Sequence, residues 1–245
     1  MEIQCKPVVM IKKFKADTIF RHCQLTIVIC IFLCLSTVSA NLYAKAPVYL
    51  TCREQPELQR MRSEELKKMV QADQAVRQNW EKISPDEHVL IAKQDRERRR
   101  RVGEIFGEGC FKTAEDYAAA ALIFQHGDLP DDYFQAYIWS NHGVELGDIQ
   151  QKHLAALAMD RYLTSIGKKQ LFASQAISSD TTKGCFCLHQ IEKTFPEKLR
   201  KEYSGVSLKE RYEWVATLNA KKDCPKLECE APLQATLKGS VPGLW

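Results

Sequence analysis

The chain has 245 residues, of which 45% are hydrophobic, and it carries 35 Lys and Arg against 31 Asp and Glu. Residues 1–40, predicted below to be an export leader, hold five of those basic residues and two of the acidic ones, so the remaining 30 and 29 nearly cancel. This balance excludes the basic excess that general nucleic-acid binding requires, and we expect no nucleic-acid partner. The residues beyond the leader suffice for one domain with a substantial core.

An apolar run from Leu25 to Val38 follows five basic residues near the N-terminus. It is shorter than the roughly 20 residues that a helix needs to cross a membrane. Val38-Ser39-Ala40 places small residues where signal peptidase cleaves. We therefore expect residues 1–40 to be a signal peptide and the protein to be exported, periplasmic or secreted. The alternative is that the leader is not cleaved and anchors the protein, and we expect contact with a membrane only in that case.

Five helices are predicted to follow a linker at residues 41–56. Apolar residues recur at spacings of three and four, and caps or glycines bound the segments. The segments are residues 57–82, 84–107, 113–127, 130–146 and 148–167. Short connections make consecutive helices antiparallel, and no strand signal competes. The sequence thus predicts an all-α core at residues 57–179, a compact helical bundle or helical-hairpin stack, in which residues 118–158 are similar to one tetratricopeptide-type hairpin.

The helical pattern weakens after Gln175. We expect a Cys-containing C-terminal segment at residues 180–245, joined by disulfides. Within and beside it the sequence indicates a loop at 178–184, short helices at 196–203 and 208–219, and an irregular tail at 231–245.

Six cysteines lie beyond the leader, and export to an oxidising compartment favours disulfides. They are Cys52, Cys110, Cys185, Cys187, Cys224 and Cys229. A bond between Cys185 and Cys187 would close a strained ring, so each is expected to reach Cys224 or Cys229, which leaves Cys52 with Cys110. The alternative is a structural zinc site made by Cys185, Cys187, Cys224 and Cys229 with His189 nearby. Otherwise no cofactor is expected.

The motifs of the common catalytic families are absent, and what remains is a set of polar residues at helix ends and within helical stripes. Candidate catalytic residues are His126, Asp128, Asp160 and Arg161, and candidate ligand-binding residues are Gln125, Gln170 and Gln175. A histidine near a carboxylate can act as a general base, and an arginine can bind an anion. The structural interpretation, which we favour, is that His126 caps its helix, Asp160 and Arg161 pair with neighbouring helices, and Gln175 satisfies backbone groups.

Five arginines occur within residues 96–101. Contact with an anionic surface is one interpretation. Pairing of Asp95 with Arg99 and of Glu97 with Arg101 at helical spacing favours the other, a solvated helix face.

The order of several motifs resembles an uncharacterised bacterial family described as a domain of unknown function. The motifs are Asp73-Gln74-x-x-Arg77, Gln125-His126-Gly127-Asp128, Asp160-Arg161-x-Leu163 and Gly167-x-x-Gln170-x-Phe172-x-x-Gln175. The likeness extends from about residue 66 to 219. This chain has Ala173-Ser174-Gln175 where that family usually has Gly-Thr-Gln. The resemblance implies a helical fold and no particular activity.

These observations favour an exported binding or interaction module of the bacterial envelope, whose partner is an unidentified envelope protein or ligand. The alternative is a hydrolase or ligand-modifying enzyme. Such an enzyme would gather the candidate polar side chains around one concave pocket, whereas an interaction module would leave them on separate helix faces.

Overall fold

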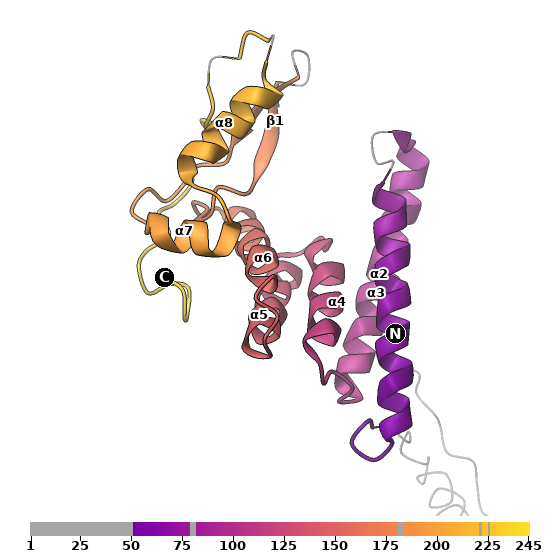
Figure 1. Ribbon diagram of the computed structural model, residues 1–245. Helices are drawn as coiled ribbons and strands as arrows, with labels where there is room; N and C mark the ends of the chain where they lie inside the picture. The colour runs from indigo at the N-terminus through magenta and orange to yellow at the C-terminus, as the bar shows by residue number, and fades with distance from the viewer. Residues whose placement is uncertain (1–50, 79–81, 181–183, 221, 225) are drawn as a thin grey trace, which may run out of the picture. The chain divides into compact units, whose positions relative to one another are not determined.

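The computed structural model describes residues 51–78, 82–180, 184–220, 222–224 and 226–245 (Figure 1). All of them belong to one compact unit, Leu50–Trp245. The predicted leader and its cleavage site lie outside the described residues. Among the helices that are described, none combines the length and the apolar character needed to span a bilayer.

Five helices follow one another in the predicted order. They are α2 (Pro56–Arg77), α3 (Pro85–Gly107), α4 (Ala114–Gln125), α5 (Pro130–Glu145) and α6 (Gln151–Ser165). The predicted capping box at Ser84 and Glu87 begins α3, and Thr113 and Asp116 form a second one that begins α4. Figure 1 shows α2 and α3 lying side by side as a long hairpin. The all-α class is confirmed.

The core has two main parts, separated along the chain. One lies among α2, α3, α4 and α5 and includes Leu66, Val102, Ile105 and Ile123. The other lies where α5 and α6 meet the C-terminal region, and here alanines on both helices allow close packing. Full burial of each large aliphatic side chain contributes about 1.5–3 kcal/mol, so tertiary packing, rather than helix propensity, holds the helices in place.

A small antiparallel sheet corrects part of the predicted loop at residues 178–184. Strand β1 (Ala176–Asp180) pairs with β2 (Cys185–Leu188), so residues 178–180 are strand rather than loop. The side chain of Asn219 accepts from the backbone N–H of Phe186 and donates to its carbonyl oxygen, each at 2.8 Å. The predicted short helices are confirmed as α7 (Glu197–Ser204) and α8 (Leu208–Leu218).

Three disulfides join the six cysteines of the described residues. Cys52 pairs with Cys110, as predicted, and Cys185 pairs with Cys224 and Cys187 with Cys229, which is one of the two arrangements that the sequence leaves open. The first joins the chain just before α2 to the chain just after α3. The other two tie β2 to the chain that follows α8. All four sulfurs of the alternative zinc site are thus used in disulfides, and no other group of potential metal ligands occurs in the described part.

Candidate functional site

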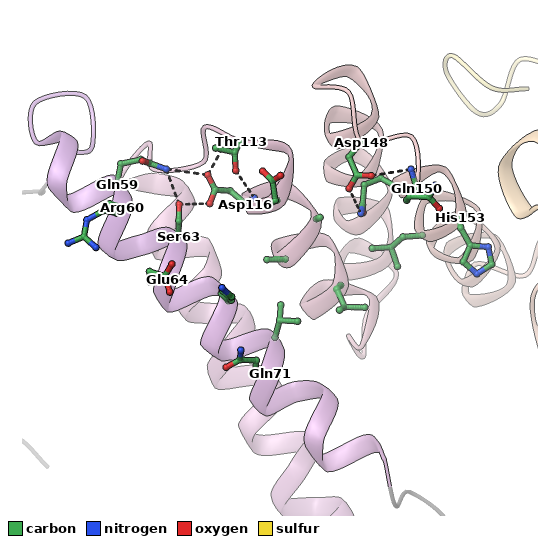
Figure 2. Close-up of a pocket in the computed structure, with 18 of the residues that line it drawn as sticks. Gln59, Arg60, Ser63, Glu64, Gln71, Thr113, Asp116, Asp148, Gln150 and His153 are labelled. Atoms are coloured by element: carbon green, nitrogen blue, oxygen red, sulfur yellow. Dashed lines mark hydrogen bonds between the residues drawn. The ribbon is translucent and has the colours of Figure 1, made fainter.

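A groove of about 870 Å³ lies between α2, α4 and α6 (Figure 2). Its floor is apolar and includes Val70, Leu122 and Leu157. Two of the carboxylates that line it, Asp116 and Asp148, are already used within the fold. Asp116 accepts from the hydroxyl of Ser63 at 2.6 Å and from two backbone N–H groups, and Asp148 accepts from the side-chain amide of Gln151 at 2.9 Å. Asp116 and Asp148 therefore have structural roles at this groove.

A smaller hollow, of about 470 Å³, collects several of the predicted polar residues. Its charged and imidazole side chains come from four places in the chain: Arg77 at the end of α2, His88 and Asp95 on α3, His126 and Asp128 between α4 and α5, and Arg161 on α6. We call it the polar hollow. Three predicted catalytic candidates, His126, Asp128 and Arg161, thus line one concave site.

His126 is held by a buried carboxylate from α2. Its Nδ1 lies 2.9 Å from Oδ2 of Asp73, which also forms an ion pair with Arg77 at 2.8 Å. Burial raises the pKa of Asp73, but the hydrogen bond and charge of His126 and the charge of Arg77 outweigh burial and leave this pKa below its ordinary value. Because an ionised carboxylate can only accept, Nδ1 of His126 carries the proton. Nε2 has no hydrogen-bond partner among the described residues.

The turn that carries His126 is too tight for any residue other than glycine at the next position. His126 ends α4, with its backbone N–H directed to the carbonyls of Ile123 and Phe124. A Cβ atom on Gly127 would lie 2.2 Å from Cβ of Asp132, well inside contact distance. The carboxylate of Asp132 accepts from the backbone N–H groups of Asp128 and Leu129 and so begins α5. The predicted capping role of His126 is thus correct for its backbone, whereas its ring faces Asp73.

Arg161 has no carboxylate partner among the described residues. Its Nη1 donates to the carbonyl oxygen of Gln125 at 2.6 Å, and its Nε donates to Oε1 of Gln175 at 3.3 Å. Burial lowers the pKa of Arg161, the nearby Tyr133 raises it, and the like charge of Arg77 lowers it again, so the net shift is downward. A largely buried guanidinium with only neutral acceptors is a strong candidate for binding an anion.

Two arginines of α3 are buried and pair with acidic residues that line the polar hollow, which corrects the prediction of a solvated face for these two positions. The side chains of Arg98 and Arg99 are only 12% and 8% exposed. Arg98 pairs with Asp95, which also pairs with Arg77, whereas Arg99 pairs with Asp128 at 2.8 Å. Arg99 also donates to the carbonyl oxygen of His126 at 3.0 Å. Arg100, in contrast, is exposed and pairs with Glu104 on its own helix.

Asp160 and Gln170 have structural roles beside the polar hollow. Buried Asp160 accepts from the backbone N–H groups of Leu171, Phe172 and Ser174, at 2.8–3.2 Å, and from the hydroxyl of Ser174. The prediction that Asp160 pairs with a neighbouring helix is therefore wrong, because its partners lie in the turn after α6. Burial raises the pKa of Asp160, while these hydrogen bonds lower it in part.

Gln170 closes the same turn with its amide, which donates to the carbonyl oxygens of Gln175 and His189 and accepts from the N–H of Gln175. Gln125 contributes its main-chain carbonyl, not its side chain, to Arg161. The side chain of Gln175 contacts Arg161 directly, in addition to the hydroxyl of Ser174.

Two residues of the site, Asp73 and Arg77, belong to the motifs that carry the family resemblance but are not among the predicted site residues. The signal that could have identified them is an acidic and a basic residue four positions apart on an amphipathic helix, with the acidic one inside the buried stripe.

No protein-family model, curated protein or solved structure matches the chain. The family resemblance therefore stays a prediction, and the function has to be argued from the polar hollow itself.

Proposed function

We propose that the chain is an exported binding module of the bacterial envelope, and that its polar hollow binds the anionic group of a small ligand through Arg161. The observation that carries this proposal is the largely buried guanidinium of Arg161, which lines the hollow and has no carboxylate partner among the described residues. A carboxylate, sulfate or phosphate group would supply that missing charge.

The neighbouring charges support Arg161 as the anchor. Asp95 and Asp128 line the hollow, but each already pairs with an arginine, at 2.8 Å from Arg77 and Arg99 respectively. Arg161 uses Nη1 and Nε in hydrogen bonds to neutral oxygens. A guanidinium has five N–H donors, so about three remain for a ligand, enough for a bidentate contact.

The size of the hollow and the cysteines support the rest of the proposal. A volume of about 470 Å³ lies within the range of small-molecule sites. Three disulfides are typical of a protein that folds in an oxidising compartment, as expected for the chain that follows a signal peptide.

Isothermal titration calorimetry tests the anchor. We expect the protein without residues 1–40 to bind at least one of sulfate, phosphate and succinate, and Arg161→Gln to weaken that binding at least tenfold. Arg100→Gln is the matched control, because this exposed arginine pairs with Glu104 outside the hollow. Equal affinities of the parent and Arg161→Gln would contradict the proposal.

A second candidate function is a hydrolase or ligand-modifying enzyme, favoured by the pair formed by His126 and Asp73. A carboxylate on Nδ1 leaves Nε2 as the base, as in other catalytic His–Asp pairs. The residues that line the hollow include no Ser, Thr or Cys, so water would be the nucleophile and its proton would pass to Nε2. Hydrolysis of p-nitrophenyl acetate or p-nitrophenyl phosphate that is lost in both His126→Gln and Asp73→Asn would favour this function over simple binding.

A further inference from the structure

We propose that the polar hollow prefers a dianionic group and takes it up together with a proton on Nε2 of His126, so that affinity for the dianion rises as the pH falls. This inference rests on the proposed anion binding at Arg161 and adds to it the charge of the ligand and its linkage to protonation.

The charges around His126 come from every element that packs against the hollow. The charged and titratable groups are Asp73 and Arg77 on α2, His88, Asp95, Arg96, Arg98 and Arg99 on α3, Asp128 in the turn, Asp132 and Tyr133 on α5, and Arg161 on α6. Each carboxylate in this set pairs with at least one arginine. Arg161 is the one arginine of this set without a carboxylate partner among the described residues, so it is the group that would balance the charge of a bound anion.

A monoanion and a dianion differ in what they leave unbalanced. Arg161 neutralises a monoanion fully, whereas a dianion beside Arg161 keeps one unbalanced negative charge in the hollow that His126 also lines. His126 lines the same hollow, and its Nε2 has no hydrogen-bond partner among the described residues. Protonation of Nε2 supplies both the second positive charge and a donor, so the dianion and the proton stabilise each other.

The proton goes to Nε2 because Asp73 keeps Nδ1 protonated throughout. The pKa of Asp73 lies below its ordinary value, so this carboxylate stays ionised between pH 5 and 8. Imidazole is the side chain that changes charge in this range. His88 also lines the hollow and is the competing source of any pH dependence.

Sulfate is the best probe, because its charge does not change between pH 5 and 8. We expect it to bind on the order of tenfold more tightly at pH 5.5 than at pH 7.5 at constant ionic strength, the change that a typical coupling between two sites produces. Calorimetry in buffers of different ionisation enthalpy should detect uptake of a proton with sulfate. Methanesulfonate, a monoanion at both pH values, should show less than about a threefold change.

Variants separate His126 from other groups. His126→Gln should lose the pH dependence of sulfate binding, so that the ratio of its affinities at pH 5.5 and pH 7.5 approaches one. His142→Gln is the matched control, because its Nδ1 also lies 2.9 Å from a carboxylate, that of Glu145, but it does not line the polar hollow. If His126→Gln fails to fold, the ring resonances of His126 in the parent, followed by NMR with and without sulfate, report its protonation directly.

The outcomes distinguish the two proposals. Sulfate binding that depends on Arg161, with no proton uptake and equal affinity at both pH values, overturns the linkage and leaves the anion site standing. A pH dependence that survives in His126→Gln and disappears in His88→Gln also overturns it. If sulfate and methanesulfonate do not bind to the parent at any pH, while succinate binds through Arg161, the preference for a dianionic oxyacid is wrong. Failure of all these anions to bind overturns both proposals.

Discussion

Nδ1 of His126 lies 2.9 Å from Oδ2 of Asp73, a residue 53 positions earlier in the chain. This contact joins the end of α4 to the last turn of α2 and fixes which imidazole nitrogen faces the polar hollow. Asp73 is fully buried and also pairs with Arg77, so one carboxylate orders a histidine and an arginine of the same site.

Asp73→Asn should therefore destabilise the protein. The amide keeps the shape of the side chain but removes the negative charge. Partly buried Arg77 then keeps Asp95 as its carboxylate partner among the described residues, and the bond to His126 is weakened. Loss of one partner in such a network costs on the order of 2–4 kcal/mol. Thermal unfolding with Asp131→Asn, an exposed position on α5, as the control measures the effect. Equal midpoints for the two variants would contradict the role we give to Asp73.

Asp73 should also make the stability of the folded protein sensitive to acid. Because the pKa of Asp73 is lower in the folded state than its ordinary value, its ionised form contributes stability above that ordinary value, and this contribution is lost as the pH falls toward the folded pKa. The free energy of unfolding should thus fall below about pH 4. Urea denaturation at a series of pH values measures this slope, and Asp73→Asn should have a shallower one than the parent.

Asp160→Ala should be destabilising by on the order of 2–4 kcal/mol. The substitution leaves three buried backbone N–H groups, those of Leu171, Phe172 and Ser174, without their acceptor. His126→Ala should cost less, because the imidazole is partly exposed and its backbone bonds at the end of α4 remain. Melting curves of both variants test this order. A midpoint for Asp160→Ala at or above that of the parent would move Asp160 from a structural to a functional role.

Ala173 is a position where shape should matter more than hydrophobicity. Its φ is 58°, in the left-handed region that disfavours side chains branched at Cβ. Ala173→Gly should change stability by less than about 1 kcal/mol, because relief of strain offsets the lost methyl group and the added chain entropy. Ala173→Val should lose about 2 kcal/mol or more. Chemical denaturation compares the pair, and equal stability of the two variants would argue against strain at this residue.

The disulfide between Cys52 and Cys110 should be a large contributor to stability. It closes a loop with a sequence separation of 58 residues, for which the chain-entropy model gives about 4 kcal/mol. The double substitution Cys52→Ala, Cys110→Ala should lower the denaturation midpoint markedly while helix content by circular dichroism is retained. A midpoint within 1 °C of the parent would show that the ends of α2 and α3 are held together by other contacts.

Local patterns predicted the helices well because their boundaries depend on neighbouring residues. Ser84 with Glu87 marks the start of α3 within four positions of the chain. Strand β1 could not be found in this way. Its pairing with β2 is supported by Asn219 and by two disulfides to residues after α8, all distant in sequence.

The sequence predicted those residues of the candidate site that local patterns mark, and it missed those that depend on distant contacts. His126, Asp128 and Arg161 are unusual residues at helix ends or in a buried stripe, so composition and spacing pointed to them. Arg99 was misread, because a pair with Asp95 on its own helix was the local expectation, whereas its partners Asp128 and Asp132 follow about 30 residues later. Long-range pairing of charges decides which arginines are buried, and one helix cannot reveal it.

The absence of a side chain at Gly127 has a consequence for how this site can vary. A Cβ atom at residue 127 would collide with Asp132, so only glycine allows the tight turn that sets the distance between His126 and Asp128. A library of all substitutions across the turn should therefore be intolerant at residue 127, although this residue contributes no functional group. Any redesign of the ligand preference would have to change the walls on α3 and α6 and leave this turn as it is.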